Sequence, residues 1–250
     1  MPTLILSARN NEDSQRLWRA AIRKGWAVER LHDWRVPEEM KSVPEPILYA
    51  EALLAPIHAT HFGLSLLEPP NEWLPRLPQA YRQRKVILTT LEQARLGEFP
   101  SFVKPPNDKS FPPTVCQCPD DLPKEYAEDA PVLVAEVVRW EKEFRCFVLD
   151  RELRTFSVYL RNGKLQRDNE FESSAIEDAE VSSFVGALLA DPRVELPRAI
   201  VIDVGMIEGR GWAVVELNAA WGSGTYGCDP DVVLDVLRFS AVPAIKNASD

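Results

Sequence analysis

The sequence predicts a mixed α/β protein in which a small N-terminal lobe, residues 1–84, precedes a larger region, residues 85–250. Two observations support this prediction. Residues 3–60 alternate between short apolar runs and segments of helical periodicity, which is typical of a small α/β unit with a mostly parallel sheet. Beyond residue 130, apolar and β-branched runs follow one another with tight turns between them, which indicates successive strands of a second sheet.

The N-terminal lobe opens with an apolar run at 3–8 that is typical of a buried strand. Asn10 or Asn11 can cap the helix that follows, and Gly25 can end it. Two further strands, a helical stretch and a proline-interrupted stretch are expected next, at 27–31, 47–50, 51–60 and 69–78.

The larger region contains seven apolar or β-branched runs that predict strands. They lie at 86–89, 101–104, 132–138, 143–150, 153–160, 199–206 and 212–217. Four helices are expected between or after them, at 91–96, 119–127, 175–190 and 229–238. Thr90 and Asp229 are suitable caps for the first and last of these helices. The region is therefore expected to combine at least one large sheet with covering helices.

Charge and cysteine content argue against several function classes. The formal net charge of −9 disfavours non-specific nucleic-acid binding, which depends on Lys and Arg neutralising phosphates. No apolar run approaches the roughly 18 residues needed to cross a bilayer, so no membrane association is expected. The four scattered cysteines indicate reduced thiols, and the N-terminal run lacks the pattern of a signal peptide. A cytoplasmic location is therefore expected.

Asp203, Glu216 and Asn218 form the strongest chemical signal. Glu216 and Asn218 are two positions apart on one predicted strand, so their side chains point to the same face of the sheet. A tight turn at 208–211 joins this strand to the strand that carries Asp203, and the hairpin can bring Asp203 to that face. Two carboxylates and an amide oxygen make an all-oxygen site that suits Mg²⁺ bridging nucleotide phosphates.

Other charged residues end or interrupt apolar strands. Lys104 ends one such strand and is a well-placed point charge for a phosphate, and Lys109 can add a second. Glu136 lies alone in an apolar run and is expected to accept hydrogen bonds from a bound group or a neighbouring lysine. Glu143 and Arg145 are two positions apart and share a face.

Each of these residues, taken singly, also has an ordinary structural explanation. Asp203 can cap a turn, Glu216 can pair with a lysine, and Lys104 can extend its amine into solvent from a strand end. Considered jointly the structural explanation weakens, because the apolar neighbours of Glu216 place its carboxylate against a core wall. His58 and His61 form an H-x-x-H pair without the intervening glutamate of a zincin motif, so a structural role is favoured for them.

The order of these residues resembles the ATP-grasp superfamily, which includes D-alanine ligase, glutathione synthetase and the ribosomal-protein glutamate ligases. The resemblance covers about residues 85–250 and is most specific at Asp203 and at Glu216-Leu217-Asn218. The run 99–105 is similar to the strand that carries the family's phosphate-binding lysine. The resemblance implies an ATP-grasp fold, in which two α/β lobes clasp the nucleotide, with ATP and Mg²⁺ as cofactors.

The resemblance also implies roles for nucleotide-binding residues. Lys104 would contact the α- and β-phosphates, and Lys85 would match the earlier nucleotide-binding lysine. The backbone of Glu136-Val137-Val138 would contact the adenine edge, and Glu143 would hold the ribose hydroxyls.

The remaining implied roles concern the metal and the reacting groups. Asp203, Glu216 and Asn218 would hold the magnesium ion. Arg145 and Arg161 would stabilise the transferring phosphoryl group or hold the substrate carboxylate.

The function implied by the resemblance is that of an ATP-dependent ligase, which joins a small-molecule or peptide carboxylate to an amine, or to a thiol, through an acyl phosphate. A phosphotransferase on the same fold, a nucleotide-binding or interaction module without turnover, and a plain structural domain are the alternatives. The segment 105–111 lacks the glycine-rich loop that usually covers the phosphates, which favours the module, although Lys109 can compensate. The N-terminal lobe is expected to contribute to substrate choice, and the oligomeric state stays open.

Overall fold

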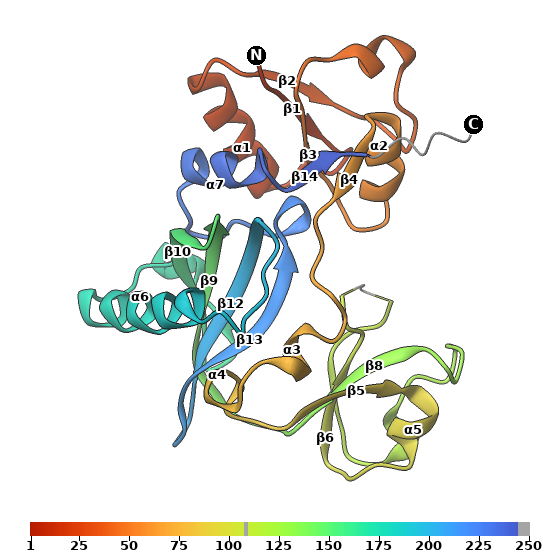
Figure 1. Ribbon diagram of the computed structural model, residues 1–250, viewed down its shortest axis with the longest axis vertical. Coiled ribbons are helices and arrows are strands. Elements are labelled where there is room, and N and C mark those ends of the chain that lie inside the picture. The colour runs from red at the N-terminus through yellow and green to blue at the C-terminus, as the bar shows by residue number, and fades with distance from the viewer. Residues whose placement is uncertain (108–109, 245–250) are drawn as a thin grey trace.

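The computed structural model describes residues 1–107 and 110–244, which form three larger sheets, one two-stranded ribbon and their covering helices (Figure 1). In the N-terminal lobe a parallel sheet has the strand order β2-β1-β3. Its elements are β1 (Thr3–Leu6), α1 (Glu12–Arg23), β2 (Ala27–Arg30) and β3 (Pro46–Tyr49). Asn11 caps α1 by accepting a hydrogen bond from the Ser14 amide, and Gly25 follows the helix with φ +72°. The expected parallel α/β lobe is confirmed.

The last elements of the described chain return to the N-terminal lobe. After β3 come α2 (Ala55–His61) and β4 (Leu64–Leu66), and β4 pairs in antiparallel fashion with β14 (Ala241–Pro243). The helix before β14 is α7 (Pro230–Leu237), which Asp229 caps and which packs against α1. The N-terminal lobe is therefore completed by a segment from the other end of the sequence.

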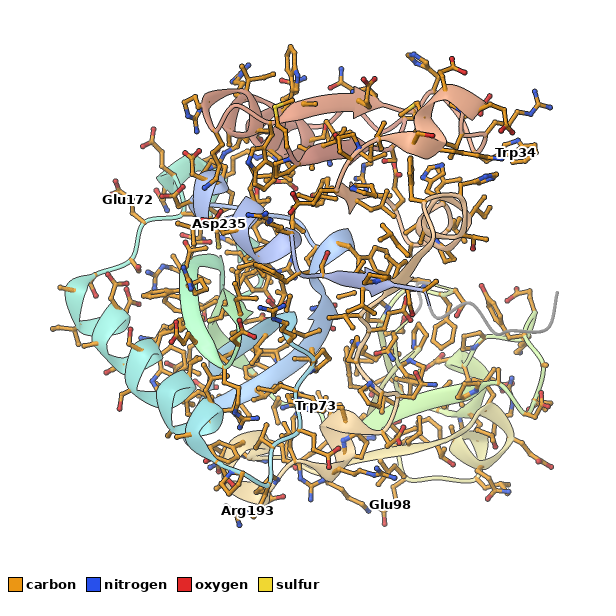
Figure 2. The ribbon with its side chains drawn as sticks, turned by 45° about the horizontal axis from the view of Figure 1, so that its top comes forward. Trp34, Trp73, Glu98, Glu172, Arg193 and Asp235 are labelled. Carbon is orange, nitrogen blue, oxygen red and sulfur yellow. The ribbon has the colours of Figure 1, made fainter. Side chains whose placement is uncertain are left out.

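Two short helices connect the N-terminal lobe to the rest of the molecule. They are α3 (Trp73–Arg76) and α4 (Gln79–Arg82), and both contact strand β13 of the large sheet described below. The Trp73 indole is buried where α3 meets that sheet and donates a hydrogen bond to the Glu195 carbonyl at 2.6 Å (Figure 2). The proline-rich linker is thus packed down and not free.

A four-stranded antiparallel sheet follows, with the strand order β5-β8-β6-β7. Its elements are β5 (Val86–Thr90), α5 (Leu91–Arg95), β6 (Ser101–Lys104), β7 (Thr114–Cys116) and β8 (Pro131–Ala135). The helix expected at 119–127 is wrong, because only a 3₁₀ turn at Pro119–Asp121 forms there. Pro123 explains the difference, since a proline pushes the preceding residue out of the helical region, and Leu122 is extended with ψ 146°.

The large sheet is antiparallel and has the strand order β11-β10-β9-β12-β13. Its strands are β9 (Trp140–Leu149), β10 (Glu152–Arg161), β11 (Lys164–Leu165), β12 (Ala199–Ile207) and β13 (Gly211–Ala219). One face is covered by α6 (Ala175–Ala190), which buries Val181, Val185 and Leu188 against Phe144. The opposite face packs on the N-terminal lobe, because Phe147 and Val201 share a core with residues of β1, α1 and α7.

No helix among residues 1–107 and 110–244 is both long and apolar enough to span a membrane.

Candidate functional site

Three neighbouring strands of the large sheet place charged side chains in one row. Arg145 of β9 lies directly opposite Asp203 of β12, and Asp203 lies directly opposite Glu216 of β13. Asn218 follows two positions after Glu216 on the same face. The structure therefore brings together the three residues that the sequence predicted as metal ligands, and adds an arginine to them.

Arg145 and Asp203 form a buried bidentate ion pair. Arg145 Nε lies 2.9 Å from Asp203 Oδ1, and Nη2 lies 2.7 Å from Oδ2. The Asp203 side chain is 0% exposed. Burial alone would lower the pKa of the Arg145 guanidinium, but the adjacent Asp203 carboxylate outweighs it and raises that pKa well above its usual value. Both partners are therefore ionised in the folded protein.

Glu216 joins this row to the four-stranded sheet. Its carboxylate accepts a hydrogen bond from Asn218 Nδ2 at 2.9 Å and contacts Lys104 Nζ, which comes from the end of β6. Asn218 Nδ2 also donates to Asp203 Oδ2 at 3.2 Å. Burial would raise the pKa of Glu216, but Lys104 and Asn218 lower it to about 2. Glu216 is thus a carboxylate at neutral pH, held between two sheets.

Lys104 and Glu216 face a cleft between the two sheets. Leu133 of β8 and Leu217 of β13 line it beside them, and Trp73 with its neighbours on α3 closes one side. A strand-borne lysine, two carboxylates and an amide thus gather at one opening. These oxygen donors fit a hard divalent cation such as Mg²⁺, and Glu216 is the more accessible of the two acids because Asp203 is fully buried and paired with Arg145.

Glu143 lies on β9 two positions before Arg145 and is 9% exposed. The Tyr159 hydroxyl donates to Glu143 Oε2 at 2.9 Å. Burial raises the pKa of Glu143 from 4.5 to about 7, against the Tyr159 hydrogen bond, which lowers it, and together with the Asp203 and Glu216 carboxylates, which also raise it. Glu143 is therefore partly protonated near neutral pH, and can both donate and accept hydrogen bonds.

The loop after β13 packs against Arg145 and the N-terminal lobe. Arg145 Nη1 donates to the Gly224 carbonyl at 3.0 Å, and its guanidinium lies 4.8 Å from the centre of the Tyr226 ring. The Thr225 hydroxyl donates to Asp13 at the start of α1 at 2.6 Å. A Cβ on Gly224 would approach Asp13 Oδ2 to 3.2 Å, so this contact favours a residue without a side chain.

Asp13 was not singled out from the sequence as a site residue. An aspartate in the first turn of a helix is expected wherever a helix begins, so its type and position give no signal of a second role. Only the packing of α1 against the loop at 223–226 reveals it.

Glu136, Val137 and Val138 lie in an irregular segment, because the strand expected at 132–138 ends at Ala135. Within the described residues, no hydrogen bond to the backbone of Val137 or Val138 is found. Glu136 pairs with Arg210, whose Nη1 lies 3.0 Å from Oε2, and accepts a 3.4 Å hydrogen bond from the Lys85 amide. The partner of Glu136 is thus an arginine of the β12–β13 turn, and Lys85 lies exposed beside it.

Two other candidate residues lie elsewhere. Arg161 at the end of β10 pairs with Glu177 of α6, with Nη1 2.6 Å from Oε1 and Nη2 2.9 Å from Oε2. The structure does not bring Arg161 to Arg145, and its role stays a prediction. Lys109 lies outside the described residues. His58 is buried with Nε2 3.2 Å from the Asp33 carbonyl, and no metal-binding group of three or more His, Cys, Asp or Glu side chains is present in the described part of the chain.

A family model described as an ATP-grasp domain, the second family of its clade, matches residues 81–236. No curated protein matches the sequence. This fold is similar to the RimK domain protein ATP-grasp from Sphaerobacter thermophilus, at 15% identity over 96% of this chain and 99% of that chain, with a TM-score of 0.52.

Two ligand complexes among the solved structures also share the fold. One is the N5-carboxyaminoimidazole synthase from Aspergillus clavatus with ADP and 5-aminoimidazole ribonucleotide, at 9% identity over 97% of this chain and 78% of that chain, TM-score 0.54. The other is D-alanine–D-alanine ligase from Bacillus anthracis with ATP, at 12% identity over 96% of each chain, TM-score 0.51. At these identities the likeness shows the fold alone.

Arg145→Met is expected to lower the free energy of unfolding by about 3–5 kcal/mol, because it leaves the Asp203 carboxylate buried without a partner. The double variant Arg145→Met/Asp203→Leu is expected to recover most of the loss. Urea denaturation measures both. Arg198→Met is the matched control, since Arg198 holds Asp150 in the same bidentate geometry at the surface and its loss should have little effect. Equal losses in the two single variants would contradict a special cost of the buried pair.

Glu143→Gln is expected to flatten the pH dependence of stability between pH 4.5 and 7. The pKa of Glu143 is raised in the folded protein, so in this window the folded state holds a proton that the unfolded chain releases, and wild-type stability falls as the pH rises. Wild type should lose up to about 1.4 kcal/mol per pH unit more than the variant. Urea denaturation across the window measures this difference, and parallel slopes would rule out a raised pKa.

Proposed function

The chain belongs to this family of ATP-grasp domains, and from that membership we propose that it is an ATP-dependent ligase that joins a carboxylate to an amine or a thiol. One observation carries the proposal. Lys104 from one sheet meets Glu216, Asn218 and Asp203 from another at the opening of a shared cleft. A phosphate-binding cation and a set of oxygen ligands in contact are what phosphoryl transfer needs most, because it depends on positioning and charge neutralisation.

Each side chain of this group has a task in the proposed reaction. Lys104 leaves Glu216 to neutralise phosphate oxygens, and Asp203, Glu216 and Asn218 hold Mg²⁺. The bound metal would supply charge stabilisation at the phosphates. Asp203 serves the cation with oxygen lone pairs that Arg145 and Asn218 do not use, since each carboxylate oxygen can accept more than one contact.

The segment between β8 and β9 supports a site for the nucleoside. The backbone groups of Val137 and Val138 are available for the adenine edge, and Lys85 lies next to them. Glu143 faces the same opening from β9, and its raised pKa lets it share a proton with a ribose hydroxyl. This assignment explains why an acid lies among apolar strands.

Arg145 connects the nucleotide site with the site proposed for the second substrate. It fixes Asp203 with two donors and the Gly224 carbonyl with a third. The loop at 223–226 and Asp13 therefore border the space where the substrates of the condensation would meet. Small-molecule or peptide carboxylates and amines are the proposed partners, Arg161 is kept as a proposed carboxylate ligand, and the cytoplasm is the proposed location on the cysteine content.

Mg-ADP is expected to stabilise wild type and not Lys104→Ala. At a nucleotide concentration about 100-fold above Kd, binding adds roughly 2.7 kcal/mol. For a chain of this length the shift in Tm should be on the order of 5–10 °C. Differential scanning fluorimetry with and without magnesium measures it. Lys124→Ala is the control, because Lys124 lies in the same part of the chain but its side chain is exposed and pairs with Asp120. Retention of the full shift in Lys104→Ala would remove Lys104 from the site.

Glu216→Ala is expected to abolish turnover while the protein stays folded, because it removes the more accessible acid of the proposed metal site. ATP is supplied with mixtures of amino acids and peptides, and the products are analysed by mass spectrometry. A ligase yields ADP, free phosphate and a condensed product, whereas a phosphotransferase yields ADP and a phosphorylated compound. Glu152→Ala, a change of an exposed glutamate in β10, is the control that should stay active. Undiminished turnover in Glu216→Ala would refute the assignment.

A further inference from the structure

Two crossings of the chain join the small-sheet lobe, residues 86–135, to the large sheet. One crossing is the segment 83–85 before β5, and the other is the segment 136–139 between β8 and β9. The Glu136 amide donates to the Lys85 carbonyl at 3.0 Å and links the two crossings. The first crossing carries Arg84, which is only 6% exposed although its neighbour Lys85 is exposed. A buried arginine at such a place calls for a reason.

The Arg84 guanidinium binds the backbone of β13 directly before Glu216. Its Nη1 donates to the Val214 carbonyl at 2.7 Å, and its Nη2 donates to the Val215 carbonyl at 2.9 Å. The guanidinium also lies 4.9 Å from the centre of the Trp140 ring, at the start of β9. One side chain therefore ties the first crossing to the strand that carries Glu216 and to the end of the second crossing.

The two carbonyls belong to an irregularity in the sheet. Asp203 pairs with Glu216, but the next residue of β12, Val204, pairs with Val214, so Val215 is an extra residue in β13. Such a bulge leaves ladder groups without strand partners and re-aims the side chain beside it. Two consecutive carbonyls that point toward one guanidinium are an arrangement that the paired donors of arginine satisfy and a single amine does not.

We propose that Arg84 is a positioning residue for Glu216. By holding the bulge carbonyls, Arg84 fixes the register in which Glu216 faces Asp203 and Lys104 and not the opposite side of the sheet. The inference rests on the proposed function, in which Glu216 is a magnesium ligand. It adds that the metal site is set by a residue outside the sheet, at the crossing on which the small-sheet lobe is attached.

The competing explanation is that Arg84 contributes only stability. Arg151 offers a matched comparison, because its guanidinium also binds backbone carbonyls, those of Leu189, Asp191 and Val194 at 2.8–2.9 Å. Arg151 lies at the turn between β9 and β10, beside the end of α6 and away from Glu216. Loss of either arginine leaves carbonyls without a donor, so both variants are expected to unfold at lower temperature.

The test is a magnesium titration of ADP binding to the full-length chain, followed by isothermal titration calorimetry. In Arg84→Met, the magnesium concentration for half-maximal enhancement of binding is expected to rise by roughly 10–100-fold, as is typical when a residue that orients a metal ligand is removed. The Kd for ADP in EDTA is expected to stay at the wild-type value. Arg151→Met is expected to match wild type in both measurements.

Arg84→Lys separates position from charge, and carries the test if Arg84→Met does not fold. It retains the positive charge but lacks the paired donors, so it is expected to show the same loss of magnesium response. A wild-type response in Arg84→Lys would overturn the positioning role. Equal magnesium dependence in Arg84→Met and Arg151→Met would overturn the inference alone. A wild-type chain without any magnesium-dependent ADP binding would overturn the proposed function, and the inference with it.

Discussion

A guanidinium and a carboxylate buried in the middle of a sheet are the constraint around which this molecule is arranged. Removing two charges from water is costly, and only good geometry and further hydrogen bonds offset the cost. Arg145 supplies that geometry to Asp203, gives another donor to the Gly224 carbonyl and lays its plane near Tyr226. Because the donors of arginine diverge in a fixed plane, the central strands, the loop after β13 and the start of α1 cannot move independently.

Much of the architecture follows from local sequence signals. The capping residues Asn11, Thr90 and Asp229 each begin a helix where the sequence predicted one, because a cap acts within a few residues of itself. The two-residue spacing of Glu216 and Asn218 was enough to predict a shared face, since alternation is a property of every strand. The helix expected at 119–127 failed at Pro123, whose effect on Leu122 is equally local and was outweighed in the prediction by the acidic pair before it.

The partners of the charged residues were much less accessible to prediction. That Arg145 faces Asp203 depends on the register of β9 against β12, and that Glu136 meets Arg210 depends on where the β12–β13 turn lies. Arg161 looked equivalent to Arg145 in the sequence, yet it binds Glu177, a residue that also caps α6. Arg84 gave no signal, because an arginine before a strand is ordinary and the bulge it binds lies 130 positions later. Long-range register is the information that one sequence alone does not reveal.

The pairing of β4 with β14 affects the order in which the molecule can be assembled during synthesis. The ribosome delivers residues 64–66 long before residues 241–243, and α1 before the α7 side chains that pack with it. Until the last part of the chain emerges, the first lobe presents an uncovered strand edge and apolar surface, the features that make nascent proteins prone to associate. The lobe made first is thus the one finished last, and its closure joins the completion of synthesis to the docking of the central sheet.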